Sequence, residues 1–336
     1  MPVSPDKIRV SIIGTGRIGF SLEKDPLRYK PCTHMGVVQT LIKKGWPLKW
    51  EYLCDLDHER ISDGKNFLNG NKNNPGTIRT TADYREVLAS KPNILIIATN
   101  TGTHREITTA AIKAGVPRIV LEKPITLTYK EALAIQKQAN TFKTHIWINY
   151  ERRYHQKYIQ LKKDIESGKA YGAPRYYRGW FASSNTSLFK KNQENEGALL
   201  HDTTHLVDLA LFLFGDVKKF QRNLPNQDSH LLTFSHDNGI SGELLTTINN
   251  RFFHFEMEII FEHARVKVGN GFTIVEKLEK SKLYKNFTSL GLPLVITDKK
   301  MQVKDNPFMN LYLKVFHDDY ETSFLKDACQ NIQYLT

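Results

Sequence analysis

The sequence predicts two domains: an α/β domain with a doubly wound parallel sheet over residues 1–149, and an α+β domain with a large, mostly antiparallel open sheet over residues 150–336. In the first part, short apolar runs alternate with helical segments, which is typical of a parallel sheet covered on both faces. In the second part, long alternating strands follow one another, and Asn-Gly pairs between them indicate hairpins. A chain of 336 residues, 40% of them hydrophobic, is long enough for two cores.

A glycine-rich segment near the start predicts a phosphate-binding loop. The apolar run Ile8–Ile13 leads directly into it. Its residues are Gly14, Gly16 and Gly19, with Arg17 and Ile18 before the last glycine. The first glycine permits a tight turn, the second lets a pyrophosphate approach the backbone, and the third lets the next helix pack closely. Free N–H groups at that helix start would face the anion, so we expect a Rossmann domain that binds a dinucleotide.

An acid after the second predicted strand bears on the choice of dinucleotide. Residues 51–55 are predicted to form a strand that ends in Asp55. A carboxylate there would accept both hydroxyls of an adenosine ribose and repel a 2′-phosphate, so we expect NAD. NADP stays possible, because Asp55 lies nearer forty than the usual roughly twenty residues beyond the glycines and because Asp57 and Arg60 follow closely. The other alternative is a solvated acid at a strand end.

The segment between these two features predicts an interrupted helix. Asp25-Pro26 and Lys30-Pro31 each break a helix, so residues 27–30 are expected to form a surface loop, with substrate contact as the alternative. The helix is expected to restart at the N-cap Thr33 and to stop at Gly45.

Later elements complete the predicted parallel sheet. Residues 62–77 are expected to form a turn-rich excursion and residues 83–89 a short helix. The apolar run 93–99 predicts a strand buried on both faces, and its carboxyl end carries Thr99, Asn100 and His104. Ligands of open α/β sheets bind at such ends. We expect His104 to orient the next helix, with direct chemistry as the alternative.

The end of the first domain follows the same alternating pattern. A run over residues 118–121 ends in Glu122-Lys123-Pro124, and a helix over 129–141 and a strand over 145–149 follow. In the second domain, one helix is expected to stop at Ser167-Gly168 and another to span 198–214. The strands there are expected over residues 176–181, 230–234, 244–248 and 252–261, with hairpins at Asn238-Gly239 and Asn270-Gly271.

Charge and cysteine content restrict the class of protein. The net charge of +12 is spread along the chain and no basic tract is interleaved with aromatic residues, so we expect no nucleic-acid partner and regard an anionic substrate as compatible. No apolar run suits a membrane span and no signal peptide is recognisable, so we expect a cytoplasmic protein without a membrane partner. Three scattered cysteines predict reduced thiols.

These motifs, in this order, resemble those of the Gfo/Idh/MocA oxidoreductases over roughly the first 215 residues. The tripeptide Glu122-Lys123-Pro124 is the most specific of them. The resemblance implies a Rossmann domain that binds NAD(P), an open-sheet second domain, and oxidation or reduction at a hydroxyl carbon of a sugar, polyol or sugar derivative. It also implies a homodimer or homotetramer.

The resemblance assigns the central role to Lys123. It matches the family's active-site lysine, which binds the reacting hydroxyl and helps its proton leave. An ammonium there would stabilise the alkoxide that develops as hydride departs. The alternative is an exposed lysine without a role.

A second match covers residues 197–208, where His205 takes the place of the family's acid/base histidine. The family's acid position is occupied by His201, and Asp202 is displaced by one residue, so either of them could assist His205. Helical spacing puts His201, Asp202, His205 and Asp208 on one face, opposite a core face. A solvated face is the alternative. The His-x-x-x-His pair also suits zinc, but no glutamate or cysteine accompanies it, so we expect no metal.

A third match, residues 149–154, resembles the family's domain junction. Tyr150 and Arg153 are expected to contact the substrate, and Glu151 replaces the family's usual asparagine. Alternatively, Arg152 and Arg153 form a surface pair at a helix start. We expect an NAD(P)-dependent dehydrogenase, and the alternatives are a catalytically inactive dinucleotide sensor or scaffold and, less well supported, a zinc-dependent hydrolase. The chain is also expected to be a shortened family member or a fragment.

Overall fold

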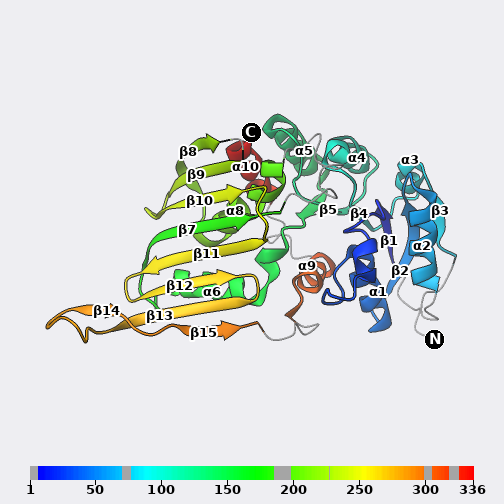
Figure 1. Cartoon of the computed structure of the whole chain (residues 1–336). Coiled ribbons are helices and arrows are strands. Elements are labelled where there is room, and N and C mark those ends of the chain that lie inside the picture. The colour runs from blue at the N-terminus through cyan, green and yellow to red at the C-terminus, as the bar shows by residue number, and fades with distance from the viewer. Residues whose placement is uncertain (1–6, 70–76, 185–197, 227, 299–304, 318–324) are drawn as a thin grey trace. The chain divides into compact units, whose positions relative to one another are not determined.

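The computed structural model describes residues 7–69, 77–184, 198–226, 228–298, 305–317 and 325–336 (Figure 1). The chain divides into two compact units. The first contains residues 1–154, 302–334 and 336, and the second contains residues 155–301 and 335. The predicted boundary between residues 149 and 150 lies near the change of unit after Tyr154, whereas most of the C-terminal segment groups with the first unit.

The first unit is built on a six-stranded sheet whose order is β3-β2-β1-β4-β5-β6. All neighbouring strands are parallel. The strands are β1 (Ile8–Ile13), β2 (Leu48–Cys54), β3 (Arg79–Thr81), β4 (Ile94–Ile97), β5 (Arg118–Leu121) and β6 (His145–Ile148). The strand order reverses between β1 and β4, as in doubly wound dinucleotide-binding domains. This part of the predicted fold class is confirmed.

Helices connect these strands and close the unit. They are α1 (His34–Lys43), α2 (His58–Asn69), α3 (Tyr84–Ala89), α4 (Thr101–Lys113), α5 (Tyr129–Phe142), α9 (Pro307–Phe316) and α10 (Leu325–Leu335), with the short 3₁₀ helices η1 (Ser21–Lys24) and η2 (Glu151–Tyr154). All four residues of β4 are buried, as the continuous apolar run predicted. Five side chains of α9 belong to the same hydrophobic core as β1, namely Phe308, Met309, Leu311, Tyr312 and Val315.

The helix after the glycine loop contains an insertion. The N–H groups of His34 and Met35 donate to the carbonyl oxygens of Ile18 and Gly19, at 3.1 and 3.0 Å. Each of these bonds joins residues that are sixteen positions apart in the sequence, whereas the bonds of an α-helix join residues four apart. The chain therefore continues the helix after an insertion of twelve residues. The predicted N-cap Thr33 is confirmed, because its side chain accepts the N–H of Gly36. Residues 27–30 are exposed, as expected for a surface loop.

The turn-rich excursion predicted over residues 62–77 is wrong for its first half. Helix α2 continues to Asn69, and residues 70–76 lie outside the described residues. Ile61, Gly64 and Leu68 are buried at helical spacing, and Gly64 packs on Met35, where a Cβ would lie 3.1 Å from its methyl group. The prediction failed because the turn residues at 69–76 were taken to mark the whole segment, whereas Gly64 within α2 serves close packing.

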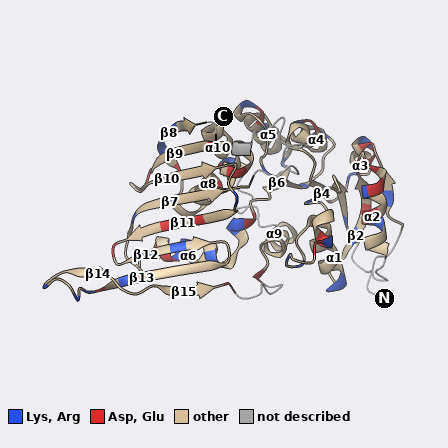
Figure 2. Cartoon of the chain, in the orientation of Figure 1, with Lys and Arg blue, Asp and Glu red and all other residues tan. Residues whose placement is uncertain are grey.

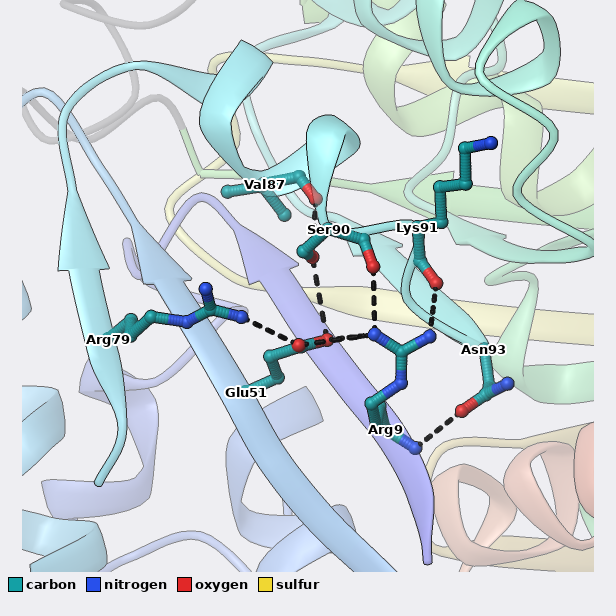
Figure 3. A network of polar contacts seen from close by, with 7 residues as sticks. All are labelled: Arg9, Glu51, Arg79, Val87, Ser90, Lys91 and Asn93. Carbon is teal, nitrogen blue, oxygen red and sulfur yellow. Dashed lines mark hydrogen bonds and ion pairs between the residues drawn. The ribbon is translucent and has the colours of Figure 1, made fainter. Parts of the chain in front are cut away.

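A polar network joins the amino ends of the strands in the first unit (Figure 3). The Arg9 guanidinium on β1 donates to Glu51 on β2 at 3.2 Å, and to the carbonyl oxygens of Ser90 and Lys91, both at 2.7 Å. Arg79 on β3 donates to the same Glu51 carboxylate at 2.7 Å. The network therefore ties three strands and the α3–β4 loop together on the edge away from the glycine loop.

The second unit contains a nine-stranded sheet with the order β14-β13-β12-β11-β7-β10-β9-β8, and β15 also pairs with β13. The strands are β7 (Pro174–Ala182), β8 (Val217–Asn226), β9 (Ser229–His236), β10 (Ser241–Thr247), β11 (His254–Phe261), β12 (Ala264–Gly269), β13 (Phe272–Lys280), β14 (Thr288–Leu290) and β15 (Leu294–Thr297). All pairs are antiparallel except β7 with β10. The large, mostly antiparallel sheet is thus confirmed.

Two helices, α6 (Gln156–Ser167) and α8 (Ala198–Phe214), belong to this unit. Helix α6 ends at the predicted stop, and α8 has the predicted bounds. Gly239 and Gly271 have φ angles of +87° and +89°, and the hairpins predicted at these glycines join β9 to β10 and β12 to β13. A Cβ on Gly179 of β7 would lie 3.1 Å from Leu206, so this glycine lets α8 pack closely on the sheet.

Charges of both signs are interspersed over the elements of each unit (Figure 2). On β11 and β12, for example, Lys267 lies 3.1 Å from Glu258. Among the helices that the structure describes, none combines the length and the apolar character needed to cross a bilayer.

Candidate active site

The carboxyl ends of five parallel strands gather the predicted site residues of the first unit. Asp55 follows β2, the glycine loop follows β1, Thr99 and Asn100 follow β4, Lys123 follows β5, and Tyr150 follows β6. Because the strand order is β2-β1-β4-β5-β6, these residues lie along one edge of the sheet in that order. This is the edge at which open α/β sheets bind ligands.

The glycine loop has the geometry of a pyrophosphate cradle. Gly14 has a φ angle of +96°, and a Cβ there would overlap the carbonyl oxygen of Ala98 at the end of β4. A Cβ on Gly19 would overlap the carbonyl oxygen of Gly14. The first helical bond runs from Phe20 N–H to the Gly16 carbonyl oxygen at 2.9 Å, so a helix starts within this loop and directs its N-terminal end toward the ligand-binding edge. These residues fit a dinucleotide.

Asp55 is locked onto this loop. Its carboxylate accepts the backbone N–H of Thr15 at 2.7 Å and the Thr15 hydroxyl at 3.1 Å. Its other oxygen accepts the N–H of Asp57 at 3.0 Å. The side chain stays half-buried, and its selection of NAD stays a prediction. The Arg60 guanidinium comes within 3.7 Å of the position that a Cβ on Gly16 would take, which brings a cation to the same place.

His104 is a buried link between two of the loops. Its Nδ1 lies 2.9 Å from the carbonyl oxygen of Pro124, and its Nε2 lies 3.1 Å from that of Thr99. The ring is fully buried on α4. These contacts support the orienting role over direct chemistry. Asn100 is exposed and Thr99 half-buried beside it, as suits residues that would line a ligand site.

The tripeptide Glu122-Lys123-Pro124 is held by its glutamate. The Glu122 carboxylate accepts Asn149 Nδ2 at 2.5 Å and the Lys123 N–H at 3.3 Å, and it contacts His34 Nε2 at 2.8 Å. Burial alone would raise the pKa of Glu122, but the hydrogen bonds from His34 and Asn149 and the charge of Lys123 bring it below its ordinary value. Glu122 is therefore a buried carboxylate beside the proposed reactive lysine. The Lys123–Pro124 bond is cis.

The junction segment carries a buried arginine. The Arg153 side chain is 2% exposed and donates to Asp327 of α10 at 2.8 Å. The alternative of an exposed pair is therefore wrong, since Arg152 is also largely buried and lies 3.5 Å from Glu151. Tyr150 is buried as well. A substrate-binding role for Tyr150 and Arg153 stays a prediction.

In the second unit, helix α8 is almost wholly buried. Among its side chains from His201 onward, all are buried except those of His201 and His205, which are half-buried and one turn apart. The expectation that Asp202 and Asp208 share an open face with these histidines is wrong, because both acids are buried. His201 Nδ1 lies 3.0 Å from Asp202 Oδ1, and the His205 ring lies parallel to that of Phe181 on β7, with centroids 6.2 Å apart.

No group of three or more His, Cys, Asp or Glu side chains with the geometry of a metal site occurs within the described ranges. All three cysteines are free and buried. Burial raises the pKa of the Cys32 thiol to about 11 and those of Cys54 and Cys329 to about 12, so near pH 7 each is a neutral thiol and a poor nucleophile.

Residues 8–150 match the model of the Gfo/Idh/MocA oxidoreductases with an NAD-binding Rossmann fold. This stretch is a Gfo/Idh/MocA oxidoreductase domain. The predicted family, the oxidoreductase class and a nicotinamide dinucleotide as cofactor are confirmed. NADP as the preferred form stays open, since relatives of both kinds exist.

The relatives of this chain include dehydrogenases of polyols and sugars. It is 24% identical to scyllo-inositol 2-dehydrogenase (NAD(+)) of Bacillus subtilis, over 78% of this chain and 74% of that protein. It is 32% identical to levoglucosan dehydrogenase of Pseudarthrobacter phenanthrenivorans, over 42% of this chain and 38% of that one. A solved structure of a levoglucosan dehydrogenase with NADH has a TM-score of 0.74 at 16% identity, and covers 97% of this chain and 94% of that one.

Sequence reasoning missed part of this site. His34 and Tyr312 were assigned no role, yet they form a buried chain with Glu122. The available signal was a histidine directly after the N-cap of the helix that follows the glycine loop. The sequence around Tyr312 gave no such signal, because Tyr312 lies 278 residues from His34.

Proposed function

We propose that this Gfo/Idh/MocA protein is an NAD-dependent dehydrogenase that acts on a hydroxyl carbon of a sugar, polyol or sugar derivative. The observation that carries the proposal is the fixed position of Lys123. It follows β5 at the ligand-binding edge of an NAD-binding domain, and the buried Glu122 carboxylate holds its backbone N–H.

Lys123 and His205 would manage the proton of the reacting hydroxyl. NAD, when bound, accepts or supplies the hydride. The Lys123 ammonium would hydrogen-bond the hydroxyl oxygen and stabilise negative charge as it develops there. The His205 imidazole would take or return the hydroxyl proton, because imidazole titrates near neutrality. His201, bonded to Asp202, would orient the substrate or assist that transfer.

Asp55 and the glycine loop would bind the dinucleotide. The half-buried Asp55 carboxylate would accept the ribose hydroxyls, and the amides of residues 16–19 would bind the pyrophosphate. Thr99 and Asn100 follow β4, next to the glycine loop, and would line the same site. His104 would act through the Pro124 carbonyl that it contacts.

A neutral sugar or polyol is the substrate class that the named relatives favour. The Arg153 guanidinium already pairs with the Asp327 carboxylate of the same chain. This pairing weakens the case for Arg153 as the group that binds an anionic substrate. No feature of the described residues favours a catalytically inactive sensor. A cytoplasmic location stays a prediction.

The test is a substrate screen of the purified chain. Inositols, pyranoses, anhydrosugars, amino sugars, sugar acids and nucleotide sugars are supplied with NAD and, in parallel, with NADP, and reduced nicotinamide is followed at 340 nm. We expect turnover with at least one neutral polyol or sugar and NAD. Failure with every compound in both directions, by a protein that binds NADH, would refute the proposed dehydrogenase.

We also propose that the chain forms a homodimer or homotetramer through the edge of its second sheet. All four residues of β15 are exposed, and Leu294, Val295 and Ile296 are 60%, 55% and 50% accessible. An exposed apolar edge strand is normally covered by a partner. Light scattering should report an oligomer, and Val295→Lys should lower its mass. A monomer at 50 μM would contradict this.

A further inference from the structure

A buried chain of hydrogen bonds runs from a C-terminal helix to the residue before Lys123. Tyr312 Oη of α9 lies 2.7 Å from His34 Nδ1, and His34 Nε2 lies 2.8 Å from Glu122 Oε1. Tyr312 and His34 are fully buried and Glu122 is 6% exposed. The three residues come from α9, from the first turn of α1 and from the end of β5, so tertiary structure alone brings them together.

With a neutral His34 ring, the protons of this chain have one consistent arrangement. Despite the burial that raises it, the pKa of Glu122 lies below its ordinary value because of the bonds from His34 and Asn149, so the carboxylate accepts. His34 Nε2 must then carry the hydrogen. In a neutral imidazole Nδ1 is an acceptor, and the Tyr312 hydroxyl donates to it. Burial raises the pKa of Tyr312 well above its ordinary value, which keeps that hydroxyl protonated.

The chain ends on the backbone of Lys123. The Glu122 carboxylate that accepts from His34 also accepts the Lys123 N–H, at 3.3 Å. On the other side, the Pro124 carbonyl oxygen is fixed by His104 at 2.9 Å. The backbone from which the Lys123 side chain starts is therefore held from both sides.

His34 and Tyr312 are themselves anchored. The backbone N–H of His34 donates to the Ile18 carbonyl oxygen, which ties the backbone of His34 to the glycine loop. Helix α9 is fixed beside it, because Asn306 Nδ2 donates to the Pro31 carbonyl oxygen at 2.6 Å and Asn310 Nδ2 donates to that of Tyr154 at 2.9 Å. Phe308 on the same helix touches the His34 ring, with centroids 5.7 Å apart, but its phenyl group forms no hydrogen bond in the chain.

We propose that Tyr312 and His34 are positioning residues for Lys123. Tyr312 fixes the tautomer of His34, His34 with Asn149 orients the Glu122 carboxylate, and Glu122 sets the backbone of Lys123 and keeps a negative charge next to its ammonium. This inference rests on the proposed function, because it is the dehydrogenase role of Lys123 that gives the positioning its effect. A reacting group misplaced by about 1 Å can lose on the order of 100-fold in rate.

The test compares Tyr312→Phe with Phe308→Leu, which alters packing on the same imidazole and removes no hydrogen bond. We expect kcat to fall about 10-fold in Tyr312→Phe. The dissociation constant for NADH should stay within about twofold and the melting temperature should resemble that of Phe308→Leu, which should keep near wild-type kcat. Equal kcat losses in the two variants, or a Tyr312→Phe kcat within twofold of wild type, would overturn the inference.

A second pair tests the same chain from His34. Gln can place an amide N–H near the position of His34 Nε2, whereas Leu cannot donate, so His34→Gln should retain at least about tenfold more kcat than His34→Leu at similar stability. Equal activities would overturn the positioning role, and this pair decides the matter if Tyr312→Phe does not fold.

A readout without turnover separates this inference from the proposed function. Nitrogen-15 spectra of the His34 ring should show a hydrogen on Nε2 and a hydrogen-bonded, unprotonated Nδ1 in the wild type, and Tyr312→Phe should shift the Nδ1 signal. If the wild type shows this pattern but oxidises no substrate, the proposed function fails and the hydrogen-bond chain stands. A wild-type ring with its hydrogen on Nδ1 would overturn the inference.

Discussion

The carboxylate of Asp55 accepts the backbone N–H of Thr15 at 2.7 Å, which joins the end of β2 to the glycine loop at the end of β1. The residue predicted to choose between the two dinucleotides therefore also shapes the loop that would hold their pyrophosphate. The Arg60 guanidinium lies near the same loop. A carboxylate would repel a 2′-phosphate at this place, and a guanidinium would attract it.

Asp55→Asn should move the preference from NADH toward NADPH. The amide oxygen can still accept from Thr15, so the loop should persist while the negative charge is lost. We expect the ratio of the NADPH to the NADH dissociation constant to fall at least about 10-fold, or about 1.4 kcal/mol, as measured by nicotinamide fluorescence. Thr15→Val removes only the hydroxyl bond and should leave the ratio within about twofold. An unchanged ratio in Asp55→Asn would show that Asp55 does not select the dinucleotide.

Glu122→Gln should change the pH dependence of turnover. The buried Glu122 carboxylate has a lowered pKa and favours a protonated Lys123. Without that charge, the pKa of Lys123 falls, and an activity that needs the ammonium is lost at a lower pH. We therefore expect the alkaline limb of the kcat/KM profile to move to lower pH, while the acid limb stays in place. A profile that coincides with that of the wild type would contradict this role of Glu122.

His205→Gln should lower kcat by about 10²-fold to 10⁴-fold, the range expected for loss of a general acid or base. His201→Gln should cost less, about 10-fold, if His201 only assists, and Asp202→Asn should match it because the two side chains are bonded at 3.0 Å. His58→Gln, at an exposed position of α2, serves as the control. If kcat falls further in His201→Gln than in His205→Gln, His201 is the acid/base and His205 assists it.

Glu51→Ala should destabilise the first unit. This carboxylate is 11% exposed and accepts from both Arg9 and Arg79, so its removal leaves Arg9 without an anionic partner (Figure 3). We expect a loss of about 2 kcal/mol in the free energy of unfolding, measured in urea. Arg79→Ala removes a half-exposed partner and should cost below about 1 kcal/mol. Equal losses in the two variants would indicate that Glu51 contributes only a surface ion pair.

Local patterns sufficed to predict most of the elements. The apolar run that contains Ile97 includes β4, and the bounds of α8 agree with the prediction. Both elements are buried, and buried elements have apolar sequences that can be recognised locally. Helix α2 was missed because Gly64 serves packing against Met35, which no local signal reveals. Strands β3, β8 and β12–β15 were also given no predicted range, since their pairing depends on partners elsewhere in the sheets.

The site residues that directly follow a strand could be predicted from the sequence. Asp55, the glycine loop and Lys123 follow β2, β1 and β5, along one edge of the sheet. The contacts of these residues were not predictable. Arg153 finds Asp327, and Glu122 finds His34 and, through it, Tyr312, over separations that the sequence pattern cannot span. Long-range polar partners decide which of the predicted residues are held in place.

The most direct test of the account is the turnover of Lys123→Ala with the substrate found in the screen, measured together with its affinity for NADH. Lys113→Ala, an exposed lysine on α4, is the matched control. We predict a kcat at least about 10²-fold below that of the control, with the dissociation constant for NADH within about threefold. A Lys123→Ala variant that keeps the kcat of the control would contradict the proposed chemistry.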